Sequence, residues 1–176
     1  MAAEITRTYT QNLPDLRLIG KKYGDGDRYK GGGPFKGTFT NKWNQWFFDG
    51  WDEVLRKLSG ENMKEVFEYW DFNVGFSRKT EGKFEYWIGY LTSAGTPVPK
   101  GLAYLDMPAC TIGICLVSCK PESVSKHKTK CAEHLKAEGF NLDDNFYLER
   151  LVYPRYTDPD ENGNVIADIC FRIKQT

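Results

Sequence analysis

The sequence predicts an α+β fold in which two β-α-β-β halves form a largely antiparallel sheet, with two main helices on one face and a cleft between them. The chain has 176 residues, enough for one domain with a sizeable core. Strand-like runs outnumber helical stripes, and the order strand, helix, strand, strand occurs twice. We therefore interpret residues 1–176 as a single domain with pseudo-repeats over about 13–92 and 101–176.

The first half begins with a strand over residues 15–23, in which Leu16, Leu18 and Ile19 are the apolar positions. A glycine-rich stretch follows over residues 24–37. It lacks both the GxGxxG spacing and a Gly-Lys-Ser/Thr sequence, so it predicts a surface loop and not a phosphate-binding loop.

Residues 42–58 predict one amphipathic helix, because one stripe at helical spacing contains Trp43, Trp46, Phe47, Gly50, Trp51, Val54, Leu55 and Leu58. The stripe contains Trp43, Trp46 and Trp51, and Ser59-Gly60 ends it. Core packing explains such a stripe. The alternative is that one or two of the indoles line a cleft beside the core.

Two strands complete the first half, over residues 68–77 and 83–92. The polar turn between them, residues 78–82, contains Gly82 and indicates a hairpin. A linker with glycine and proline, residues 93–100, leads into the second half.

The second half repeats this order. Strand patterns cover residues 101–106 and 109–120, and residues 121–138 predict a helix that begins with proline. Two further strands follow over residues 145–153 and 165–174, separated by a turn-rich polar loop. Because hairpins predominate, the sheet is expected to be mostly antiparallel.

The charge balance argues against broad binding to nucleic acid. Lys plus Arg and Asp plus Glu number 24 each, so the formal net charge is zero, whereas nucleic-acid binding needs a basic face. Lys126, His127, Lys128 and Lys130 form a short basic cluster, which we interpret as a solvated helix face. We therefore expect no direct contact with DNA.

Five cysteines without a CxxC motif, together with only two histidines, indicate a reducing compartment and no structural zinc site. The N-terminal residues have no apolar signal region, and no apolar run is long enough to cross a membrane. The sequence thus predicts a cytoplasmic protein that needs no metal, no cofactor and no membrane.

The aromatic share is high, at 15%, which exceeds what a core of this size normally requires. The surplus indicates a ligand cleft or a homodimer interface. Strand alternation places Tyr147, Glu149, Leu151 and Tyr153 on one face, so that a carboxylate stands in an aromatic row. A half-exposed strand, or a salt bridge to Arg150, Arg172 or another cation, would explain this. Alternatively, Glu149 meets a cationic ligand or moves a proton.

Several segments together resemble the GyrI-like, AraC-type effector-binding domain family, from about Leu13 to Lys174. No single motif is specific, and the order and spacing carry the match. The segments are Leu18-Ile19-Gly20, Phe84-Glu85-Tyr86-Trp87-Ile88-Gly89, Val98-Pro99-Lys100-Gly101-Leu102, Met107-Pro108-Ala109-Cys110-Thr111, Leu148-Glu149-Arg150 and Asp168-Ile169-Cys170-Phe171-Arg172-Ile173-Lys174. One departure is Arg172, where the family often has proline; Arg172 could pair with Glu149 if it projects inward.

The resemblance implies a protein that binds small amphipathic, often cationic, aromatic molecules in an aromatic cleft, with Glu149 as the electrostatic anchor. Residues 1–12 are too short for a helix-turn-helix, so we expect a stand-alone effector-binding or toxin-sequestering protein, with a homodimer or a regulator in trans as possible partners. The ligand-binding residues expected are Glu149, Tyr147, Tyr153, Tyr104, Trp87 and Trp51.

A catalytic branch of the same family supplies the alternative. Its stand-alone members hydrolyse cyclopropane-bearing DNA-alkylating natural products, with an aromatic cleft and a glutamate that activates water. The resemblance therefore makes Glu149 the catalytic residue if the protein is a hydrolase. Turnover lost in Glu149→Gln while binding persists would separate the two activities.

Overall fold

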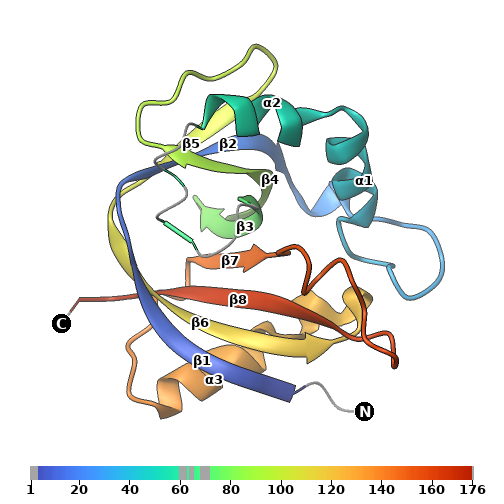
Figure 1. Ribbon diagram of the computed structural model, residues 1–176, viewed down its shortest axis with the longest axis vertical. Helices are drawn as coiled ribbons and strands as arrows, with labels where there is room; N and C mark the ends of the chain where they lie inside the picture. The colour runs from blue at the N-terminus through green and yellow to red at the C-terminus, as the bar shows by residue number, and fades with distance from the viewer. Residues whose placement is uncertain (1–3, 60–62, 64–65, 68–71, 176) are drawn as a thin grey trace.

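The computed structural model describes residues 4–59, 63, 66–67 and 72–175, and these form an α+β structure built on one eight-stranded antiparallel sheet (Figure 1). The strand order is β1-β6-β8-β7-β3-β4-β2-β5. The strands are β1 (Glu4–Leu13), β2 (Leu16–Tyr23), β3 (Asn73–Thr80), β4 (Lys83–Ser93), β5 (Ala103–Met107), β6 (Cys110–Cys119), β7 (Tyr147–Arg150) and β8 (Val165–Ile173). The predicted fold class is confirmed.

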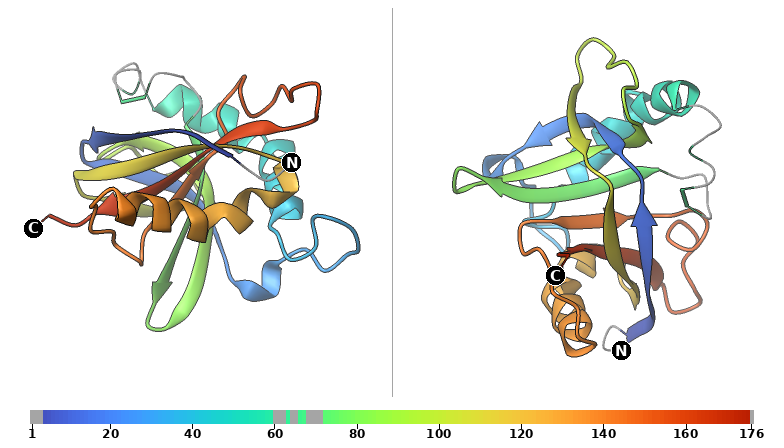
Figure 2. Two further views of the ribbon diagram at one scale, coloured as in Figure 1. Left: turned by 90° about the horizontal axis from the view of Figure 1, so that it is seen from below. Right: turned by 90° about the vertical axis from the view of Figure 1, so that its left-hand side faces the viewer.

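The helical elements lie beside the sheet, with α1 and α2 near one end and α3 near the other (Figures 1 and 2). They are η1 (Asp25–Asp27), α1 (Thr40–Phe48), α2 (Trp51–Leu58), η3 (Pro121–His127) and α3 (Lys128–Ala137). In the described part of the chain, no helix is long and apolar enough to cross a membrane.

The strand pairing is symmetric about the β3–β7 pair at the centre of the sheet. On one side β4 and β2 follow β3, and on the other side β8 and β6 follow β7. Each outermost strand comes from the opposite half of the chain: β1 lies beside β6, and β5 lies beside β2. The division into pseudo-repeats at 13–92 and 101–176 stays a prediction.

Strand β1 was not predicted, because only one of its ten residues, Leu13, is buried, so its sequence lacks an apolar face. The connection after β1 meets the connection after β5, since the Ala109 N–H donates to Asp15 Oδ1 at 2.7 Å. The two places where the chain crosses between halves are therefore held against each other.

The helix predicted over residues 42–58 is two helices. Gly50, at φ 71°, lies in the left-handed region between α1 and α2, and only glycine enters that region without strain. The expected helix over 121–138 is likewise divided, into the 3-10 turn η3 and helix α3.

Two predicted strands differ in length from those observed. Residues 68–71 of the predicted strand 68–77 lie outside the described residues, and β3 runs from Asn73 to Thr80. Strand β7 ends at Arg150, three residues before the predicted end at Tyr153, because the chain turns away there and the Tyr156 N–H bonds the Val152 carbonyl.

Both helical layers cover the same face of the sheet. The Trp46 indole of α1 donates to Asn73 Oδ1 of β3 at 2.9 Å. Leu135 of α3 packs on Gly113 of β6, where an added Cβ would lie 3.2 Å from Leu135 Cδ1. Between these two contacts, strands β3 and β7 present the residues in step with Asn73, which are Gly75, Ser77, Tyr147 and Glu149. These residues therefore lie under the gap between the helical layers.

The opposite face contains a buried ion-pair cluster. Asp168 Oδ2 lies 3.2 Å from Arg150 Nη1 and 2.5 Å from Arg155 Nη2. The Arg150 and Asp168 side chains are almost completely buried, at 3% and 0% exposed. Arg150 therefore points away from Glu149 and is not its ion-pair partner.

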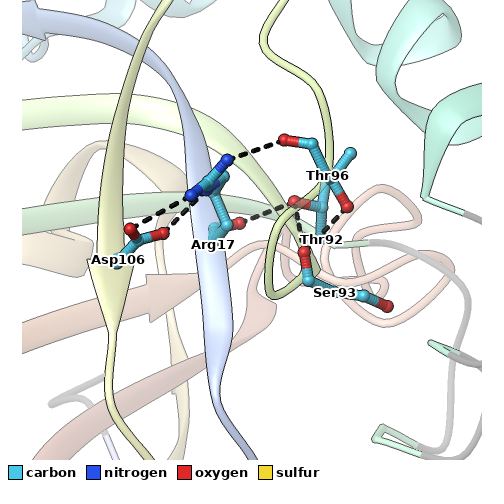
Figure 3. A network of polar contacts seen from close by, with 5 residues as sticks. All are labelled: Arg17, Thr92, Ser93, Thr96 and Asp106. Atoms are coloured by element: carbon cyan, nitrogen blue, oxygen red, sulfur yellow. Dashed lines mark hydrogen bonds and ion pairs between the residues drawn. The ribbon is translucent and has the colours of Figure 1, made fainter.

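At the β5 edge of the sheet, Arg17 of β2 forms hydrogen bonds to β5 and to the segment that follows β4 (Figure 3). Its guanidinium forms two hydrogen bonds to Asp106 of β5, at 2.7 and 3.1 Å, and one to the Thr96 carbonyl at 3.0 Å. It also lies 4.3 Å from the centre of the Tyr104 ring. Tyr104 thus belongs to this surface network.

Candidate ligand-binding cavity

A cavity of about 310 Å³ lies over β3, β4 and β7, between the segment leading into α1 and the segment η3–α3. This volume is at the lower end of the range for small-molecule sites. Most of its lining is aromatic or apolar. The lining residues are Arg28, Phe35, Thr38, Phe39, Thr40, Trp43, Ser77, Phe84, Tyr86, Pro121, Glu122, Val124, Ser125, Lys128, Tyr147, Glu149, Leu151 and Tyr156.

Glu149 lies at the floor of this cavity and is only 6% exposed. Both of its carboxylate oxygens accept hydrogen bonds from tyrosines. Tyr86 donates to Oε1, and Tyr147 donates to Oε2 at 3.1 Å. Within the described part of the chain, Glu149 forms no salt bridge. Two neutral donors therefore hold a buried acid in place without compensating its charge.

Gly75 makes room for this arrangement. It is the register partner of Glu149 across the β3–β7 pair. A Cβ at Gly75 would lie 2.4 Å from Tyr86 Oη and 2.5 Å from Glu149 Oε1, both too close for any real contact. The absence of a side chain there allows the carboxylate and the phenol to meet above the sheet.

Burial raises the pKa of Glu149 above its ordinary value. The hydrogen bonds from Tyr86 and Tyr147 and the charge of Lys128 act in the opposite direction. The pKa values of both tyrosines lie well above the ordinary value, because burial and the neighbouring carboxylate disfavour phenolate. The tyrosines consequently remain hydrogen-bond donors at neutral pH, while the carboxyl group titrates at a higher pH than an exposed glutamate.

The wall on the α1 side is a cluster of stacked rings. Phe39 stacks on Tyr86 with centroids 4.2 Å apart and planes 8° from parallel. The Trp43 indole donates to Tyr86 Oη at 3.0 Å, which orients the phenol toward Glu149. The Arg28 guanidinium lies 4.8 and 4.9 Å from the ring centres of Phe39 and Phe84. This wall is therefore aromatic, and it already holds one cationic group, Arg28, over two of its rings.

Lys128, the first residue of α3, lines the opposite wall. Its Nζ lies 4.6 Å from the centre of the Tyr147 ring. Burial lowers the pKa of this lysine, and the nearby Glu149 carboxylate raises it. The interpretation of residues 126–130 as a wholly solvated basic cluster is therefore wrong at Lys128, because η3 turns this side chain inward at the start of α3.

Of the six ligand-binding residues predicted from the sequence, Glu149 and Tyr147 line the cavity, and the structure brings them into direct contact. The other four do not line it. Trp87 is 4% exposed and points to the opposite face of β4, since the alternation of that strand turns Tyr86 toward the cavity.

Trp51, Tyr104 and Tyr153 lie elsewhere. Trp51 begins α2 and packs beside Gly101, with Lys21 Nζ 5.6 Å from its ring centre. Tyr104 is 52% exposed in the Arg17 network, and Tyr153 is 62% exposed beyond the end of β7. Strand alternation could not place Tyr153, because the strand has already ended there.

Arg172 does not pair with Glu149 either. Its guanidinium binds the Asp143 carboxylate, with Nε 2.9 Å from Oδ2. Neither arginine considered from the sequence is therefore a partner of Glu149, because Arg150 binds Asp168. The ion-pair explanation for Glu149 with these two residues is wrong.

Sequence reasoning missed the residues that complete the site, chiefly Tyr86, Phe39 and Lys128. Tyr86 is adjacent to Trp87 in a correctly predicted strand, and only the register with β3 decides which of the two faces the carboxylate. Phe39 lies two residues beyond the glycine-rich stretch 24–37, in a short connection to which no element was assigned. Among the described residues, no group of three or more His, Cys, Asp and Glu side chains could hold a metal ion.

No protein-family model matches the chain, and no curated protein matches it. Solved structures do. A protein from Staphylococcus aureus MU50, described as a candidate bacterial transcription regulation protein, is 15% identical with TM-score 0.62, over 96% of this chain and 99% of that one. SAV2435, solved with bound tetraphenylphosphonium, is 15% identical with TM-score 0.64, over 96% of this chain and 94% of that one.

The C-terminal domain of EcmrR is also similar, at 11% identity and TM-score 0.52, with each chain covered completely. All three identities are low, so the likeness concerns the fold. The chain thus shares its fold with a protein described as related to transcription regulation, with SAV2435 in its tetraphenylphosphonium-bound form and with the C-terminal domain of EcmrR.

Proposed function

We propose that this protein is a GyrI-like domain that binds small amphipathic molecules with cationic or aromatic character in the cavity around Glu149. One observation carries the proposal: a buried carboxylate lies at the floor of an aromatic cavity and has no salt bridge among the described residues. Removing a carboxylate from water is costly, and a bound cation would offset that cost.

The cavity wall adds a second attraction. The rings of Phe39, Trp43 and Tyr86 line the same cavity as Glu149, and a cation over an aromatic ring gains about 0.5–2 kcal/mol. The hydrogen bonds from Tyr86 and Tyr147 fix the carboxylate before a ligand arrives, which reduces the ordering cost of binding. The fold shared with SAV2435, which binds tetraphenylphosphonium, supports the same class of ligand.

Tetraphenylphosphonium is the probe for the test, because it is a permanent cation with four aromatic rings. We expect saturable binding that quenches tryptophan fluorescence, since Trp43 lines the cavity. Glu149→Gln should weaken binding by about tenfold or more, because one unit charge close to the ligand is lost. The control is Glu133→Gln on the exposed side of α3.

Two results would overturn the proposal. One is the absence of binding for tetraphenylphosphonium and for a panel of cationic dyes. The other is a Glu149→Gln variant whose affinity for the cation equals that of the wild type and that of the control variant Glu133→Gln.

Hydrolysis is the second candidate, and the raised pKa of Glu149 favours it. A carboxylate whose pKa is raised is a stronger general base than an exposed one. In the cyclopropane reaction, Glu149 would take a proton from water while the water oxygen bonds a ring carbon. The breaking C–C bond would deliver its electrons to the electron-withdrawing group of the substrate. Product formation that disappears in Glu149→Gln, with binding retained, would favour this candidate over simple capture.

We also propose that the protein acts in the cytoplasm through ligand capture and not through contact with DNA. The balanced formal charge of zero supports this view. A partner would then be a second copy or a regulator in trans. Light scattering with and without tetraphenylphosphonium tests the homodimer, and DNA mobility-shift assays test the absence of direct binding.

A further inference from the structure

A second cavity, of about 410 Å³, adjoins the Glu149 cavity. The two share Ser77, Phe84 and Lys128 in their linings, so they meet at these three side chains. The remaining lining residues of the second cavity are Arg78, Lys79, Asp144 and Asn145, so its charged side chains are three basic groups and one acidic group. A ligand longer than the first cavity would therefore extend from an aromatic environment into a basic one.

Two of the four charged side chains that line the second cavity have salt-bridge partners. Arg78 Nε lies 2.9 Å from Glu85 Oε2, and Asp144 Oδ1 lies 3.1 Å from Lys136 Nζ. Lys79 and Lys128 are the lining cations that form no salt bridge within the described residues. Together these two lysines leave the second cavity with uncompensated positive charge.

The position of Lys128 is the main observation. Its side chain is half-buried at the junction of the cavities, and its Nζ lies 4.6 Å from the centre of the Tyr147 ring. A lysine drawn partly out of water is costly without an anion beside it. The Glu149 carboxylate attracts Lys128 electrostatically, but each of its two oxygens already accepts a hydrogen bond from a tyrosine.

We propose that the second cavity is an anion-binding subsite, in which Lys128, assisted by Lys79, receives a carboxylate, sulfate or phosphate group of the molecule whose aromatic part occupies the Glu149 cavity. The preferred ligands would then be bipolar: an aromatic cation bearing an acidic substituent, and not a simple cation. The inference rests on the proposed function, because it requires the first cavity to hold the aromatic part.

The test uses rhodamine B and its ethyl ester. Both dyes carry the same aromatic cation, and only rhodamine B carries a free carboxylate at neutral pH. Fluorescence anisotropy gives the ratio of the two affinities for the wild type, for Lys128→Gln and for Lys79→Gln. The matched control is Lys126→Gln, which removes the same charge from an exposed position that lines neither cavity.

We expect the wild type to prefer the acid over the ester by about tenfold, which is typical of one charge-assisted hydrogen bond. The ratio should fall to about one in Lys128→Gln, fall part of the way in Lys79→Gln, and keep its wild-type value in Lys126→Gln. Denaturation midpoints of all variants establish that they are folded.

Three results would overturn the inference while leaving the proposed function intact, provided that tetraphenylphosphonium still binds in a Glu149-dependent manner. The first is a wild-type ratio of one or below. The second is an unchanged ratio in Lys128→Gln, which would make Lys128 a counter-ion for Glu149 alone. The third is failure of both dyes to bind. If tetraphenylphosphonium does not bind either, the proposed function itself fails.

Discussion

Gly75→Ala is the substitution that most directly tests the geometry of the cavity floor. The added Cβ would lie 2.4 Å from Tyr86 Oη and 2.5 Å from Glu149 Oε1, whereas ordinary contact begins at 3.4 Å. Each oxygen would have to retreat by about 1 Å. Neither can do so freely, because Tyr86 is stacked on Phe39 and bonded to both Trp43 and Glu149.

We therefore expect Gly75→Ala to lower the free energy of unfolding by about 1–3 kcal/mol, the usual cost of overpacking. The same change should weaken tetraphenylphosphonium binding, because the carboxylate leaves its position. Urea denaturation and a fluorescence titration measure the two effects. Gly26→Ala is the control, since nothing lies within 4 Å of its added Cβ. Equal stability and equal affinity for the two variants would refute the geometric reasoning.

Three further predictions concern charge. Cation affinity should fall on acidification, because protonation removes the charge of Glu149. Burial raises the pKa of Glu149, so the loss should begin at a higher pH than for an exposed glutamate. Titrations with tetraphenylphosphonium between about pH 4 and 8 measure this change. Asp168→Asn should cost about 3–5 kcal/mol in urea denaturation, because it leaves the buried Arg150 without its partner, and a cost near zero would contradict that role. Asp106→Asn should leave the denaturation midpoint unchanged, because its bond to Arg17 is solvent-exposed.

The fold class followed from the sequence because periodicity reports which face of each element is buried. The β3–β4 hairpin and most strand positions were accessible in this way. Strand β1 was not, since an edge strand with little burial has no apolar face to display. The break at Gly50 was also missed, because the apolar stripe continues through it from α1 into α2.

The site was predictable only in its centre. Alternation within β7 correctly placed Tyr147 beside Glu149. The remaining lining depends on the register between strands and on how η3 and the segment before α1 fold over the sheet, and periodicity within one element carries no information on either. Hence Trp87 was chosen where Tyr86 lies in the cavity, and Lys128 was assigned to the solvated surface.

The exchange of β1 and β5 between the halves has a mechanical consequence. Each half supplies the edge strand of the other, and Asp15 binds Ala109 where the two connections cross. The two halves are therefore joined by both edge strands and by this hydrogen bond. The two blocks of strands on either side of the β3–β7 pair therefore stay joined where the chain crosses between them. The segments that cover the cavity, residues 24–39 and η3, lie outside the strands, so they can move while the strand pairing at the floor of the cavity is kept.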